Sequence, residues 1–166
     1  MNLQWLGIKR GRANVPKLKA IYIASGAGQP MQSLRSVTAV QDRGLQGDRY
    51  YENTGHWKLL DGCQVTLITK HELERAGKRS KIKLDDGSHR RNLVIEGIKL
   101  KALQGKHFKI GDAIFAYDKP RPPCGYIDGV ACPGMGRALS HNSGICIRVL
   151  RTGVLSVDDP IEIFNE

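Results

Sequence analysis

The chain has 166 residues, of which 40% are hydrophobic, and is therefore long enough for one domain with a hydrophobic core. No apolar run approaches the roughly 20 residues that cross a bilayer, and the N-terminal segment lacks a secretory-signal pattern, so we expect a cytoplasmic protein without membrane contact. The excess of 26 basic over 16 acidic residues favours anionic partners, whereas no basic block or aromatic RNA-binding pattern supports nucleic acid.

Short segments rich in β-branched residues recur along the chain, separated by Gly, Asp and Pro. They lie at 18–24, 36–40, 63–69, 91–97, 107–117, 144–151 and 161–164. Short strands at such intervals are typical of an antiparallel sandwich or barrel. The sequence therefore predicts a mainly β fold with a few short helices, in a single domain that spans residues 1–166.

Two stretches carry helix signals. The T-x-x-E pattern of Thr69 and Glu72 is a capping box, and it predicts a short helix through Ala76 that ends at Gly77. A second helical turn or two is expected at 136–141. Helices are thus expected to be a minor part of the fold.

The stretch GLQGDRYYENTGHW, at 44–57, lies inside an irregular segment, 42–62, that is rich in Gly, Asp and aromatic residues. Long irregular segments in a compact domain are often functional. The glycines before Asp48 and Arg49 predict a tight turn, which can present backbone N–H groups and a guanidinium to an anion. A purely structural Asp48–Arg49 ion pair explains the same residues at least as well.

The stretch SHRRNLVIEG places Arg90, Arg91 and Asn92 at the start of a predicted strand. Strand alternation would put Arg90 and Asn92 on one face and Arg91 on the other. Arginine matches phosphate or carboxylate, and an asparagine amide can pair with the edge of a heterocycle. Solvated charges at a strand start are the structural alternative.

The stretch RPPCGYIDGVACPG begins with Arg121, and two prolines stiffen the backbone directly before Cys124. A thiolate at a stiff turn, close to an arginine, could bind a soft metal. The alternative is a small hydrophobic side chain in a loop, which is the usual role of a cysteine.

The other cysteines carry weaker signals. No pair has CxxC spacing, and a chain of this length predicts reduced thiols instead of a disulfide framework. Cys63 and Cys146 lie in predicted strands and are expected in the core, whereas the role of Cys132 stays open. A zinc site of Cys124, Cys132, His141 and Cys146 has spacings unlike compact zinc motifs. A nucleophilic Cys–His pair would join Cys124 to His56, His89 or His141, without a local signature.

Taken in order, the motifs resemble the MOSC domain, named for the C-terminal part of molybdenum cofactor sulfurase. The matching pieces are GLQGDRYY (44–51), VTLIT followed by HELE (65–74), RRNLVIEGIKLKALQGKHFKIGDAIF (90–115), RPPCGYID (121–128) and SGICIRVLRTGVLSVDDPIEI (143–163). The resemblance covers about Leu18 to Ile163. Each piece alone is weak, whereas the ordered series is specific.

The resemblance implies a β fold built around a barrel and a role in binding the molybdenum cofactor, molybdopterin. It places the family's cysteine, the expected molybdenum ligand and catalytic residue, at Cys124. The residues expected to hold the phosphate and the pterin are Asp48, Arg49, Arg90, Arg91 and Asn92. The family is also associated with pyridoxal phosphate binding. Net positive charge would help to attract an acidic cofactor.

Three functions remain open under this resemblance. Relatives protect against N-hydroxylated bases or reduce amidoximes, so the first expectation is a reductase of N-oxygenated small molecules, with His141 or Asp128 as an acid if either lies near the metal. The second is a sulfur-transfer or cofactor-carrier module with a persulfide on Cys124. The third, and least favoured, is a basic barrel that binds nucleic acid.

The sequence departs from the family pattern in two ways. The last strand is commonly preceded by Gly-Asp-Pro, but VDDP puts Asp158 at the glycine position. Aspartate tolerates a positive φ better than most residues, so only the local turn is in question. The N-terminal barrel extension and ferredoxin-like tail of larger reductases are also absent, which predicts a separate redox partner protein as the electron donor.

Overall fold

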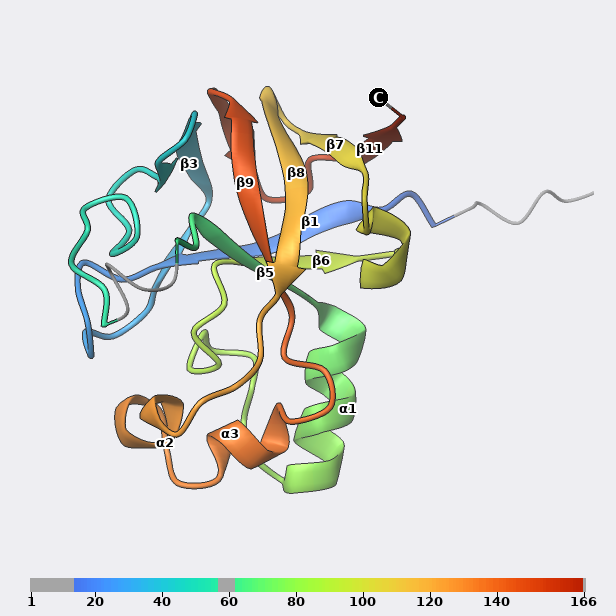
Figure 1. Cartoon of the computed structure of the whole chain (residues 1–166). Helices are drawn as coiled ribbons and strands as arrows, with labels where there is room; N and C mark the ends of the chain where they lie inside the picture. The colour runs from blue at the N-terminus through green and yellow to red at the C-terminus, as the bar shows by residue number, and fades with distance from the viewer. Residues whose placement is uncertain (1–13, 57–61, 166) are drawn as a thin grey trace, which may run out of the picture.

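The computed structural model describes residues 14–56 and 62–165, so Trp57 of the first motif lies outside it (Figure 1). The strands are β1 (Lys17–Ile23), β2 (Gln32–Leu34), β3 (Ser36–Val40), β4 (Gly44–Leu45), β5 (Val65–Thr69), β6 (Leu93–Glu96), β7 (His107–Ile110), β8 (Ala113–Pro120), β9 (Ile145–Arg151), β10 (Gly153–Ser156) and β11 (Ile161–Phe164). The helices are α1 (Lys70–Ser80), α2 (Tyr126–Val130), α3 (Met135–Ala138) and the 3-10 turn η1 (Leu100–Leu103). Within the described ranges, no helix is long and apolar enough to cross a membrane.

The strands form two sheets. The larger has the order β11-β7-β8-β9-β5-β6-β1-β2, and the smaller has the order β10-β3-β4. Neighbouring strands are antiparallel except for β5 and β6, and α1 supplies the crossover that a parallel pair needs. The prediction of a mainly β fold with few helices is confirmed, although in the part described the strands do not close into one hydrogen-bonded barrel.

Each predicted strand segment contains a strand, but several bounds shift. The segment 107–117 is a hairpin of β7 and β8 that turns at Gly111, whose φ is +58°. The strand in segment 91–97 begins only at Leu93. The unpredicted strands β2, β4 and β10 have 3, 2 and 4 residues, too few to show an alternating pattern.

Helix α1 begins as predicted and ends later. The Glu72 amide donates to Thr69 Oγ1 at 3.1 Å and the Thr69 amide donates to Glu72 Oε2 at 3.2 Å, which completes the capping box. The predicted end at Gly77 is wrong: the helix continues to Ser80, and Lys81 at φ +59° donates its amide to the Gly77 carbonyl. Glycine costs about 1 kcal/mol in a helix interior, which packing of the buried helix face offsets.

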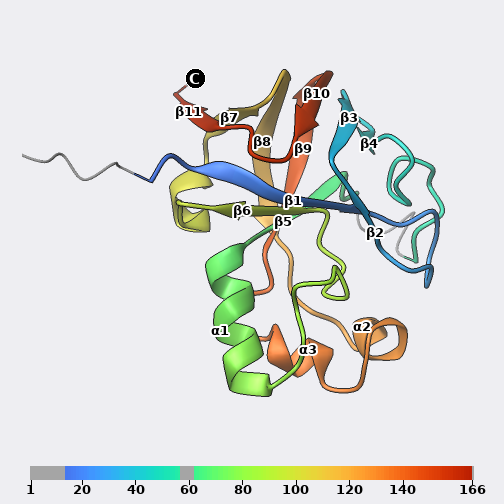
Figure 2. The ribbon, with the colours of Figure 1, turned by 180° about the vertical axis from the view of Figure 1, so that it is seen from behind.

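The central strands β1, β5 and β6 contribute apolar side chains to clusters on both faces of the sheet, since alternate side chains of a strand point to opposite faces. One face contributes to the main core, through Ile21, Leu67 and Leu93. The other contributes to a smaller cluster with α1 and α3, through Tyr22, Ile68 and Val94. Figure 2 shows α1, α2 and α3 gathered below these strands, with β3, β7, β8, β9, β10 and β11 above them. Helix α3 lies one residue earlier than the predicted stretch 136–141 and is shorter.

Two smaller expectations are confirmed. Cys63 and Cys146 are buried, with their Sγ atoms 2.8 Å apart. Asp158 takes a positive φ of +76°, as a residue in place of a turn glycine must. Its amide donates to the Leu18 carbonyl at 2.8 Å, which ties the turn to β1. The departure from the family pattern is therefore accommodated locally.

Candidate functional site

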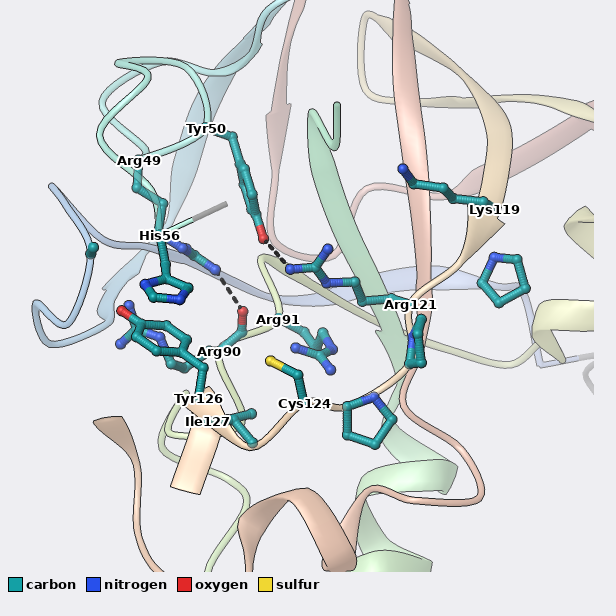
Figure 3. Close-up of a pocket in the computed structure, with 14 residues that line it drawn as sticks. Arg49, Tyr50, His56, Arg90, Arg91, Lys119, Arg121, Cys124, Tyr126 and Ile127 are labelled. Carbon is teal, nitrogen blue, oxygen red and sulfur yellow. Dashed lines mark hydrogen bonds between the residues drawn. The ribbon is translucent and has the colours of Figure 1, made fainter. Parts of the chain in front are cut away.

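A cavity of about 490 Å³ opens where three distant segments meet: the loop after β4, the residues before β6, and the chain from β8 to α2 (Figure 3). We call it the arginine cavity. It is lined by Ala27, Arg49, Tyr50, His56, Arg90, Arg91, Lys119, Pro120, Arg121, Pro122, Pro123, Cys124, Tyr126 and Ile127. The fold thus brings together residues of all three motifs that the sequence singles out.

Arg49 is buried and is held from behind. Its Nη1 lies 3.1 Å from Asp48 Oδ1, and its Nη2 donates to the Arg90 carbonyl at 3.0 Å. Asp48 is fully buried, accepts hydrogen bonds from the amides of Ala24 and Tyr50, and does not line the cavity. The ion pair of the structural interpretation therefore exists, and it positions an arginine on the cavity wall. Binding of an anion by this arginine stays a prediction.

Arg90 and Arg91 both line the cavity. Arg90 has a φ of +62° and β6 begins only at Leu93, so the predicted strand alternation, with the two arginines on opposite faces, is wrong. Arg91 Nε and Nη2 donate to the carbonyl and hydroxyl oxygens of Ser143, each at 2.6 Å. Arg90 Nη1 donates to the Gln29 carbonyl at 2.7 Å, whereas its buried Nη2 has no partner among the described residues.

Asn92 lies behind the cavity and is not part of its lining. Its Oδ1 accepts from the amide and the hydroxyl of Thr66, both at 3.0 Å, and its Nδ2 donates to the Tyr22 carbonyl at 3.1 Å. The side chain therefore ties β1 and β5 to the segment that carries the arginines. Its place in the structure is that of a positioning residue.

Cys124 lies on another wall, just after two prolines that follow β8. Its thiol is free and exposed, and it points toward the arginines (Figure 3). The Arg121 amide donates to the Gly144 carbonyl at 3.0 Å, and Arg121 Nη2 donates to the Tyr50 hydroxyl at 3.0 Å. These bonds fix the segment that presents the cysteine.

The described charged side chains that line the arginine cavity are all cationic. The described lining residues include four arginines and one lysine, but no carboxylate. Burial, with help from Arg121, lowers the pKa of Arg91 to about 10, and burial and then Arg49 lower the pKa of Arg90. An anion in the cavity would oppose both shifts, because it favours the protonated guanidinium. The cavity is therefore suited to an anionic ligand.

Tyr50, His56, Lys119 and Tyr126 also line the cavity, and of these four the sequence analysis named only His56, as a partner for a nucleophilic Cys124. The rings of His56 and Tyr126 stack, with centroids 3.9 Å apart and an interplanar angle of 10°. Tyr50 adjoins the GDR motif and Lys119 ends a strand just before the proline pair, so proximity to a motif was the available signal. The stacking of His56 on Tyr126 could not be predicted, because the two residues are distant in sequence.

Other sequence candidates lie elsewhere. Cys132 is half-buried against the smaller cluster, and His141 is exposed; neither lines the arginine cavity. Asp128 Oδ1 accepts from the Gly136 amide at 2.7 Å. No group of three or more His, Cys, Asp or Glu in residues 14–56 and 62–165 could hold a metal ion. The zinc arrangement considered above is therefore wrong.

Comparisons with known proteins agree with this fold. The structure is similar to the YuaD protein from Bacillus subtilis, with 16% identity over 90% of this chain and 95% of that chain and a TM-score of 0.74. It is also similar to YiiM from Geobacillus stearothermophilus (16% identity, 90% of this chain and 75% of that chain, TM-score 0.69) and YiiM from Escherichia coli (15%, 90% and 70%, 0.64). A search of curated proteins found no match.

The fold and the cavity define a mainly β protein with a cavity lined by cationic side chains. The family model described as the MOSC domain matches residues 54–162, which is more than half of the chain. The chain therefore belongs to the MOSC domain family, and its role is related to the molybdenum cofactor.

Proposed function

We propose that this protein binds the molybdenum cofactor in the arginine cavity and reduces N-hydroxylated compounds with electrons from a separate redox partner. One observation carries the proposal: the free thiol of Cys124 faces a cavity whose described lining has five cationic side chains and no carboxylate. This combination joins a soft metal ligand to an anion site.

The residues fit the cofactor in two respects. Arg90 Nη2 is buried and has no hydrogen-bond partner among the described residues, and a phosphate oxygen would satisfy it. A thiolate at Cys124 is a ligand that a metal held by sulfur donors accepts. Arg90, Arg91 and Arg121 would therefore hold the acidic end, with Arg49 behind them, and Cys124 would hold the metal.

When bound, the cofactor would supply the two-electron chemistry that removes the oxygen of an N–O bond. The overall reduction of a hydroxylamine consumes two electrons and two protons and releases an amine and water. His56 lines the cavity and could deliver a proton to the departing oxygen. Its stacking on Tyr126 fixes the ring in the wall, and the flat stacked pair could also support a planar substrate.

The exposure of Cys124 also favours a second candidate, a sulfur-transfer or cofactor-carrier module. A persulfide must reach an acceptor protein, so its cysteine has to be accessible. This candidate shares cofactor binding with the first and differs in lacking turnover of N–O substrates.

The test is metal and pterin analysis of protein purified anaerobically from a cofactor-replete host. We expect stoichiometric molybdenum and pterin, loss of molybdenum in Cys124→Ser, and retention in the matched control Cys132→Ser. Loss in Cys132→Ser alone would reassign the ligand, and absence of both components after reconstitution would reject the proposal. Reduction of an N-hydroxylated base with an artificial donor then separates the reductase from the carrier.

A further inference from the structure

A second cavity, of about 520 Å³, lies between α1, the strands β1 and β6, and the loop at 84–89. We call it the His89 cavity. It shares no lining residue with the arginine cavity. The two are nevertheless adjacent in sequence, because His89 lines one while Arg90 and Arg91 line the other.

His89 offers this cavity an unused donor. The side chain is fully buried, and its Nδ1 accepts from the Arg91 amide at 2.9 Å. Because Nδ1 must then carry the lone pair, Nε2 carries the proton of the neutral ring. Burial lowers the pKa of His89 to about 3, which keeps the ring neutral at physiological pH. Within the described residues Nε2 has no hydrogen-bond partner, although the ring of Tyr22 lies edge-on at 5.5 Å.

The walls around this donor are apolar. They come from β1, α1, the loop at 84–89 and β6, and are formed by Ala20, Tyr22, Leu73, Leu84 and Val94. The Tyr22 hydroxyl already donates to the Asp85 carbonyl at 3.2 Å, so the ring presents its hydrocarbon surface. A cavity with apolar walls and one convergent polar group is the usual form of a small-molecule site.

Basic residues accompany the apolar wall. Lys19, Lys70 and Lys78 line the cavity, against Glu74 and Asp85. Lys70 is committed to ion pairs, at 3.5 Å to Glu74 and 3.6 Å to Glu96. Lys19 and Lys78 make no ion pair within the described residues, so they remain to complement an anionic group.

We propose that the His89 cavity binds a small aromatic carboxylate, whose ring lies against Tyr22 and Leu84 and whose carboxylate accepts the Nε2 proton of His89. Lys19 and Lys78 favour the anion over a neutral analogue. This site is separate from the proposed cofactor site and does not depend on that function.

The experiment uses 1-naphthoate as the probe and follows amide shifts of the full chain by NMR. We expect saturable shifts at β1, α1 and residues 84–89, with about tenfold weaker binding of 1-naphthalenemethanol. Ala20→Phe fills the cavity from a strand and should abolish binding. His89→Asn keeps an acceptor for the Arg91 amide but loses the Nε2 donor, and should weaken binding about tenfold.

Arg121→Ala is the matched control, because an aromatic anion could instead enter the arginine cavity. We expect that variant to bind 1-naphthoate within about twofold of the parent chain. Loss of binding in Arg121→Ala with retention in Ala20→Phe would overturn the proposal. So would equal affinity for the carboxylate and the alcohol, or the absence of saturable shifts at millimolar probe. If Ala20→Phe does not fold, the decisive variant is Lys78→Glu, which should weaken binding of 1-naphthoate through its charge alone.

Discussion

The two cavities are similar in size, about 490 and 520 Å³, and the lining of each includes a residue with a buried N–H group that has no partner in the described residues. Their described walls differ in the balance of charge: the arginine cavity has five cations and no carboxylate, whereas the His89 cavity combines apolar side chains with three lysines and two carboxylates. Arg90 Nη2 sits among cations, whereas His89 Nε2 sits among apolar side chains. An unsatisfied donor therefore marks a place for an acceptor, and the surrounding charge decides what kind of molecule carries it.

The contrast also shows how the fold treats charge. Arg49, Arg90 and Arg91 are buried, which is costly for a cation unless it is paired or hydrogen-bonded. Backbone carbonyls, Ser143 and the single carboxylate of Asp48 supply most of that compensation. An anionic ligand would supply the rest of that compensation, including an acceptor for Arg90 Nη2. Concentration of such groups in one cavity is typical of functional sites.

The largest effect expected from this contrast is in thiol reactivity. Cys124 opens to solvent in the arginine cavity, whereas Cys63 and Cys146 are buried. Alkylation by iodoacetamide should be about a thousandfold faster at Cys124, because buried thiols react only after an opening that costs about 4 kcal/mol. Peptide mass spectrometry over time gives the rates. Comparable rates at the three cysteines would mean that the arginine cavity is no more open than the core.

The second effect concerns anion affinity. Arg90→Met removes the guanidinium with the unused donor, so affinity for inorganic phosphate should fall about 10- to 100-fold, the range for a lost charged hydrogen bond. Calorimetric titration measures the change. Arg43→Met is the matched control, because Arg43 is exposed and bonds to Tyr51 outside the cavity. An equal loss in the control would assign phosphate binding to net charge and not to the cavity.

The sequence was informative where function depends on local pattern. The strands with alternating or continuous apolar residues were predicted, and so was the Thr69–Glu72 capping box. The motifs around Arg49, Arg90 and Cys124 were identified, and the structure places all three on one cavity. Such motifs are visible because their turns need particular residues, such as the glycines before Asp48 and the prolines before Cys124.

What could not be predicted depends on distant contacts. His56 and Tyr126 lie in two of the quoted motifs, but they stack only in the folded chain, and no local pattern predicts that contact. Alternation failed at Arg90 because a left-handed residue before β6 breaks the strand period. The His89 cavity could not be predicted either, because it depends on contacts between distant segments. Its walls come from β1, α1 and β6, each of which resembles ordinary core in sequence.

The smallest expected effect is on the free energy of unfolding, and it tests the apolar surroundings of His89. The folded-state pKa of His89 is about 3, below its ordinary value of 6.5, so the unfolded chain binds the extra proton first. The contribution of neutral His89 to the free energy of unfolding is therefore complete above pH 6.5 and is lost as the pH falls toward about 3. The slope is about 1.4 kcal/mol per pH unit, or about 2 kcal/mol between pH 6.5 and 5.

His89→Asn should lack this slope, because asparagine does not titrate. Urea unfolding of both chains at pH 7 and pH 5 measures the difference, and the other histidines cancel because both chains contain them. Arg91, which disfavours the charged imidazole, and Asp86, which favours it, are likewise the same in both chains. If the two chains lost equal stability, His89 would have to be solvated or partnered by an acceptor in the free protein. The His89 cavity would then be polar, and its contrast with the arginine cavity would fail.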